Sequence, residues 1–149
     1  MSLLHSMRIS RSALEAQRLR MDLIANNVAN MNTTRTASGQ PYRRQTVLFA
    51  EQGRELPFRD VLGRARGEDQ RMGGVRVTGI REDTTPFRRV QDPTHPDADA
   101  DGWVLMPNID VVTEMTDLTS ANRAYQASAT VLNATKSIAL AALGIGRAG

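Results

Sequence analysis

The 149-residue sequence contains no cysteine, which excludes disulfide bonds, thiolate catalysis and cysteine-based metal sites. Aromatic residues are scarce: one Trp, two Tyr and three Phe leave a compact core with few large side chains to fill it. No run of residues is long and apolar enough to cross a membrane. The N-terminal residues also lack the apolar segment of a secretory signal peptide, so we expect no ordinary cleaved signal.

Lysine is nearly absent as well. The net charge is +3, and because Lys136 is the only lysine, almost all of the positive charge is carried by arginine. Arginine forms planar, forked contacts that suit protein interfaces as well as nucleic acids. Arginines at residues 43–44, 64–66 and 88–89 leave a nucleic-acid-binding module open as an alternative function. Against it, aromatic residues for base stacking are rare and no known nucleic-acid module fits.

The C-terminal part carries the strongest pattern. Residues 111–143 contain no Pro or Gly, and apolar side chains recur every seven residues, which predicts a long helix with a seam for another helix. The seam comprises Val111, Leu118, Tyr125, Leu132 and Ala139, with Met115, Ala129 and Leu143 four residues after three of them.

A second stripe of small and apolar residues runs along the same helix. One partner helix cannot cover both stripes, because a helix that is apolar on two sides needs two sets of neighbours. Two arrangements therefore stay open: a bundle within one chain, or a helix that completes its burial against other subunits. The second stripe comprises Ala121, Ala124, Ser128, Val131, Thr135, Ile138 and Ala142.

Residues 3–31 predict a second helix with the same seven-residue repeat. The helix ends among Asn, Thr and Ser residues, which favour caps and turns. Near that end, the asparagine amides are expected to bond to neighbouring backbone or to a partner chain, the alternative being a frayed, solvated helix end. The repeat comprises Met7, Leu14, Met21 and Val28, and the amides belong to Asn26, Asn27 and Asn30.

The middle of the chain predicts a small β-rich module inserted between the two helices. Alternating apolar and polar residues between turn residues indicate short strands, and Gly79 is expected to mark a β-bulge. The strands are expected within residues 42–49, 74–81, 85–90 and 102–106, with a loop and one helical turn in residues 51–73. The predicted class is α+β, divided into residues 1–35, 36–110 and 111–149.

One local motif resembles the first half of a calcium-binding loop. Asp97, Asp99, Asp101 and Gly102 have the D-x-D-x-D-G spacing, but the twelfth position, which requires a bidentate Glu, is Asn108. Calcium binding is therefore the weaker alternative to a rigid turn. His95 lies in the same loop without a second histidine or a nucleophile. No arrangement typical of a catalytic centre or a cofactor site is present, so we expect no cofactor and no enzyme activity.

Several segments resemble a known family. ALEAQRLRMDLIANNVANMNTTRT (13–36) resembles the N-terminal signature of the flagellar axial proteins, which form the rod, hook and filament junction. PYRRQTVLF (41–49), the block from Asp83 to Met115 and SANRAYQASATVLNATKSI (120–138) look like one branch, the proteins of the proximal rod.

The resemblance implies a structural subunit that polymerises through paired terminal helices (a D0 core) into a torque-transmitting rod, with the β-rich middle outside the core. It implies a periplasmic basal-body location, export by the flagellar type III apparatus, and contacts with other copies and with FlgB, FlgF, FlgG and FliE. It implies neither nucleic-acid binding nor membrane insertion.

Combining the resemblance with the stripes, we expect the Val111–Tyr125–Leu132 stripe to pair with the N-terminal helix and the Ala121–Ser128–Val131–Ile138 stripe to contact adjacent subunits. The expected assembly residues are Met7, Leu14, Met21, Asn26, Asn27, Val28, Asn30, Met115, Leu118, Tyr125, Ser128, Val131, Leu132 and Ile138.

Overall fold

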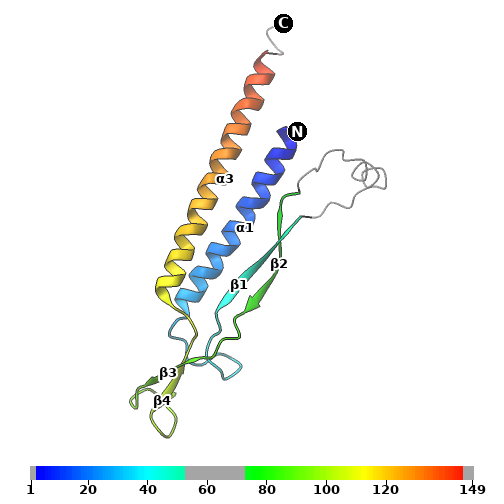
Figure 1. Ribbon diagram of the computed structural model, residues 1–149. Coiled ribbons are helices and arrows are strands. Elements are labelled where there is room, and N and C mark those ends of the chain that lie inside the picture. The colour runs from blue at the N-terminus through cyan, green and yellow to red at the C-terminus, as the bar shows by residue number, and fades with distance from the viewer. Residues whose placement is uncertain (1–2, 53–72, 146–149) are drawn as a thin grey trace, which may run out of the picture.

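Two antiparallel helices form the long axis of the molecule (Figure 1). The structure is a computed structural model that describes residues 3–52 and 73–145. Helix α1 spans Leu3–Ala29 and helix α3 spans Val111–Ile145. Short antiparallel strands occupy the middle of the chain, so the predicted α+β class is confirmed.

Helix α3 begins at an N-cap, Asp110, that the sequence provides three residues after Pro107. The carboxylate of Asp110 accepts hydrogen bonds from the backbone N–H of Thr113 (3.2 Å) and from the Thr113 hydroxyl (2.5 Å). These bonds satisfy donors that an uncapped helix start would leave without a partner. Helix α1 ends in the Asn-rich stretch, where Asn30 N–H still bonds to the carbonyl of Asn26 and the chain then turns.

The seam between α1 and α3 differs from the predicted one. Ala121 is fully buried and Thr135 is 7% exposed, whereas Met115 is 50% exposed and Val111 is 36% exposed. Within the described residues, α1 is the only helix or strand that contacts α3, so the buried residues mark the α1-facing side. Placing Ala121 on the outward stripe was therefore wrong. The helices approach along small side chains, and the seam runs between the two predicted stripes.

The middle of the chain forms two separate two-stranded sheets, whereas a single β-rich module was expected. Strand β1 (Gln45–Glu51) pairs with β2 (Val75–Glu82), and both contact α1. The register shifts so that Leu48 pairs with Gly79 and Phe49 with Val77, which leaves Thr78 as the extra residue. The bulge expected at Gly79 is thereby confirmed.

Strand β2 enters its sheet very close to α1. The backbone N–H of Val75 donates to the Ser12 hydroxyl oxygen at 3.1 Å. A Cβ atom added at Gly74 would lie only 2.1 Å from that same oxygen. Glycine at position 74 is therefore what lets the sheet dock on the helix at this point.

The second sheet lies beyond the Asn-rich end of α1 (Figure 1). Strand β3 (Arg88–Gln91) pairs with β4 (Trp103–Met106) in an antiparallel register. All four strands fall within or beside the predicted segments. The helical turn predicted around residues 58–62 lies outside the described residues.

Candidate functional site

A set of polar side chains around two buried residues joins the start of α3 to the end of α1 and to the chain entering β1. We call it the junction cluster, and it consists of Arg20, Asn27, Arg44, Glu114 and Asp117. Glu114 is fully buried and Asn27 is 1% exposed, although both side chains are polar. Burying a polar group costs free energy unless the group is hydrogen-bonded or paired. Each contact in this cluster therefore offsets part of the cost of burying Asn27 and Glu114.

Asn27 is the neutral centre of the junction cluster. Its amide N–H donates to the Gln45 carbonyl at 2.9 Å and to the Glu114 carboxylate at 3.1 Å. Its carbonyl oxygen accepts from the Gln45 N–H at 2.9 Å and from the Tyr42 hydroxyl at 3.1 Å. The side chain thus pairs with the Gln45 backbone as a neighbouring strand would, and it holds the first residue of β1 against α1.

Two arginines and two carboxylates make up the charged part of the cluster. Arg44 donates to Glu114 (2.5 Å) and to Asp117 (3.2 Å), and Arg20 donates to the other oxygen of Asp117 (3.1 Å). Burial alone would lower the pKa of Arg44, but the hydrogen bond and the charge of Glu114 raise it overall. Arg44 therefore stays charged, and it pairs with Glu114, whose carboxylate has no access to water.

Asn27 was predicted from the sequence as an interacting residue, but its charged partners were not. Glu114 lies seven residues before Ala121, so it occupies the seam position of the second stripe. Glu114 could have been recognised from the sequence, because it is a charged residue at the first position of a repeat of small and apolar residues. Arg44 carried no such signal, because it lies outside both helices.

The other two predicted asparagines are placed less deeply. Asn26 is exposed and Asn30 is half-buried, and the amide N–H of Asn30 donates to both oxygens of Asn26, at 2.9 Å each. The Asn26 amide also donates to the Tyr42 hydroxyl at 3.3 Å. All three asparagines thus bond within the chain.

Apolar side chains remain uncovered on α3, away from α1. Val131 and Ile138, which lie seven residues apart on one face, are 54% and 59% exposed, and we call them the uncovered stripe. Leu140 and Leu143 are 59% and 67% exposed on the final turns, which we call the overhang. Lys136 is the only charged residue between residues 124 and 145. Uncharged apolar surface of this kind is typical of a protein–protein contact.

The remaining predicted assembly residues lie along the seam or beside it. Those of α1 are half-buried, as are most of those on α3, whereas Met115 is exposed. The half-buried residues are Met7, Leu14, Met21, Val28, Leu118, Tyr125, Ser128 and Leu132.

The acidic loop forms turns. Asp99 accepts hydrogen bonds from the N–H groups of Asp101 and Trp103, and Asp97 accepts from the Thr34 hydroxyl at 2.7 Å. His95 accepts from the N–H of Asp97 at 3.1 Å. Across residues 3–52 and 73–145, no group of three or more His, Asp or Glu side chains could hold a metal ion. The calcium alternative therefore gains no support.

The described arginine pairs make internal contacts. Arg43 stacks over Phe87 (4.2 Å to the ring centroid), and Arg89 stacks over Trp103 (5.3 Å). Arg44 belongs to the junction cluster. Arg64 and Arg66 lie outside the described residues. The nucleic-acid alternative gains no support from these contacts.

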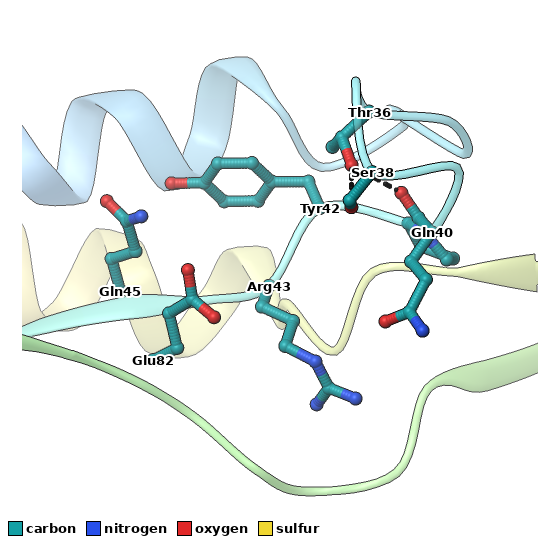
Figure 2. Close-up of a pocket in the computed structure, with 8 residues that line it drawn as sticks. Thr36, Ser38, Gln40, Tyr42, Arg43, Gln45 and Glu82 are labelled. Atoms are coloured by element: carbon teal, nitrogen blue, oxygen red, sulfur yellow. Dashed lines mark hydrogen bonds between the residues drawn. The ribbon is translucent and has the colours of Figure 1, made fainter.

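A polar pocket of about 270 Å³ lies beside the junction cluster (Figure 2). Figure 2 shows the Tyr42 ring extending toward α1 while Arg43 points away from it. The hydroxyl of Thr36 bonds to Ser38 and to the Gln40 carbonyl, so the loop that forms one wall is held by its own contacts. Burial raises the pKa of Tyr42, and the nearby carboxylates of Glu82 and Glu114 add to the effect.

Comparison with known proteins agrees with this architecture. A family model described as "Flagella basal body rod protein" matches residues 7–35, and one described as "Flagellar basal body rod FlgEFG protein C-terminal" matches residues 100–145. The two matches cover most of α1 and all of α3. The chain is 44% identical to the flagellar basal-body rod protein FlgC of Bacillus subtilis, over 99% of this chain and 100% of the relative. The chain belongs to the FlgC family of flagellar basal-body rod proteins.

Other FlgC relatives are similar over the same extent. Identity is 42% with the protein of Borreliella burgdorferi, over 97% of this chain and 98% of the relative. It is 41% with that of Salmonella typhimurium, over 99% of this chain and 100% of the relative. The chain is therefore a structural subunit of the flagellar basal-body rod, assembling with other basal-body proteins. Neither helix, over its described residues, is apolar enough to span a bilayer.

Proposed function

We propose that this FlgC-family chain builds the proximal rod by packing the uncovered stripe of α3 against neighbouring subunits. The observation that carries the proposal is the exposure of Val131 and Ile138 on a helix that α1 covers from one side only. Burying each side chain in an interface contributes about 1.5–3 kcal/mol, and this gain is repeated at every subunit contact. The role is structural and not catalytic.

The predicted assembly residues then fall into two groups. The half-buried residues of the seam, such as Leu14 and Leu132, hold α1 and α3 together, while the exposed residues Val131, Ile138 and Met115 contact other chains. We further propose other copies of this chain, FlgB, FlgF, FlgG and FliE as neighbours, with delivery by the flagellar type III export apparatus to a periplasmic rod. A contact between different surfaces of successive subunits extends into a helical tube unless it closes into a ring.

The experiment replaces one residue of the uncovered stripe. Val131→Asp should leave the thermal midpoint of the purified chain unchanged, because the side chain is already half in water. It should prevent incorporation into basal bodies and abolish motility, because an unpaired carboxylate would be buried at each contact. Thr130→Asp introduces the same charge one residue away, at an exposed position on another face, and serves as the control. Normal rods built from Val131→Asp subunits would refute the proposal.

A further inference from the structure

We propose that the junction cluster sets the axial register of α3 against α1 and thereby fixes where the uncovered stripe lies on the subunit. Its members act as positioning residues for assembly. The register is a property of the single folded chain. Only its use, which is to place the uncovered stripe for assembly, rests on the proposed function.

The seam above the junction cluster repeats every seven residues on both helices. On α1, the buried Ser10 and Ile24 are two such steps apart with Gln17 between them, and on α3 Ala121, Ser128 and Thr135 follow at the same spacing. A slide of α3 by seven residues therefore places small and apolar side chains of α3 opposite α1 again. Heptad seams without paired polar groups discriminate poorly between registers, and buried polar pairs are a known device for selecting one.

The polar residues of the α3 seam do not supply that selection. The hydroxyl of Ser128 donates to the Ala124 carbonyl (2.9 Å), and that of Thr135 donates to the Val131 carbonyl (2.8 Å), four residues back in the same helix. Both groups are satisfied within α3, whatever lies opposite. On α1, Gln17 leaves its buried Oε1 without a donor, so it fixes no partner either.

The junction cluster, in contrast, does not repeat. Glu114 bonds at the same time to Asn27 of α1 and to Arg44, which is held outside both helices because its backbone N–H donates to Asn108 (3.1 Å). A slide of α3 in either direction would separate Glu114 from Asn27 and Arg44 together. Seven residues correspond to about 10 Å of helix, so a slide would displace the uncovered stripe by that distance.

Neither sheet holds α3 at a fixed height along α1. Apart from their contact with each other, strands β3 and β4 do not pack on any other described helix or strand. Helix α3 contacts only α1 among the described helices and strands. The polar contacts of Glu114 and Asp117 with Arg20, Asn27 and Arg44 therefore fix the axial position of α3 against α1.

The experiment measures the register directly by pulsed electron resonance between two spin labels. Because the chain has no cysteine, Arg18→Cys on α1 and Asn133→Cys on α3 provide two unique and exposed attachment points. The labelled parent chain should give one narrow distance. Adding Asn27→Leu and Glu114→Leu should produce a second distance that differs from the first by up to about 10 Å, while circular dichroism shows that the helices are retained.

The matched control makes the same two chemical changes elsewhere, as Glu15→Leu and Asn122→Leu at exposed positions, and should keep one distance. If the Asn27→Leu and Glu114→Leu chain fails to fold, Glu114→Gln provides a milder variant, in which a minor second distance is expected. A single unchanged distance in the folded variants, or a broad distribution in the parent chain, would overturn the proposal. None of these readings depends on rod assembly, so the proposed function and the register are tested separately.

Discussion

Asn27 and Gln45 exchange two hydrogen bonds of 2.9 Å each, so that a side chain on α1 completes the backbone pairing of the first residue of β1. The same amide also reaches Glu114 at the start of α3. One residue therefore connects three elements, and it is 1% exposed.

Asn27→Ala should lower the free energy of unfolding by about 2–3 kcal/mol, because buried partners on Gln45 and Glu114 lose their hydrogen bonds. Asn26→Ala, at the exposed neighbouring position, should cost less than about 1 kcal/mol. Urea unfolding followed by circular dichroism measures both values. Equal losses in the two variants would contradict the central role given to Asn27.

Gly74→Ala should destabilise the chain strongly, because the added Cβ would lie 2.1 Å from the Ser12 hydroxyl oxygen. Gly79→Ala is the matched control: no atom lies within 4 Å of its added Cβ, so the change should have little effect. Combining Gly74→Ala with Ser12→Gly should recover part of the lost stability. Thermal unfolding of the three variants tests whether the close approach at Ser12 determines the effect.

Gln17→Met should stabilise the helix pair. Its buried Oε1 has no donor among the described residues. Replacing the amide with an apolar side chain of similar length removes an unsatisfied group, which is worth about 1 kcal/mol or more. Chemical denaturation should show a higher midpoint with an unchanged slope, and a lower midpoint would indicate a partner that Gln17 needs.

Stability should decline in acid as Asp110 takes up a proton. Hydrogen bonds from the Thr113 hydroxyl and then from the Thr113 N–H lower the pKa of Asp110 below its ordinary value of 3.8. A lowered folded pKa means that the stabilisation is present above pH 3.8 and is lost as the pH falls through the folded value. Asp110→Asn keeps an oxygen for the cap and should make the acid slope shallower in pH-dependent thermal melts.

The overhang should matter for assembly and little for the folding of the single chain. Leu140→Ser and Leu143→Ser replace side chains that are 59% and 67% exposed, so the free energy of unfolding should change by no more than about 0.5 kcal/mol each. Incorporation into basal bodies, measured by co-purification, should fall in the double variant. Leu132→Ser, inside the seam, is the contrasting variant, because it should lower the free energy of unfolding of the single chain.

Local patterns in the sequence predicted the elements well. The helix predicted from residue 111 begins there, because Asp110 caps it and no Pro or Gly interrupts it. The bulge beside Gly79 and the approximate places of all four strands also followed from local chemistry.

Long-range relationships did not follow from the sequence. Arg44 and Glu114 are 70 residues apart, and nothing in either segment indicates that the other will lie beside it. The orientation of α3 was misjudged for a related reason. The larger side chains suggested the seam, whereas close helix approach selected the line of Ala121, Ser128 and Thr135, with Met115 turned to solvent.

The unequal lengths of the two helices give the subunit a direction. Helix α3 has 35 residues and α1 has 27, and α3 runs past the start of α1 at one end, while the β3–β4 pair occupies the other (Figure 1). A linear polymer of such subunits has two chemically different ends. One end exposes the final turns of α3, and the other exposes strands and turns. Adding a subunit at one end is then a different reaction from adding it at the other, so the two ends of the polymer have different rates of growth.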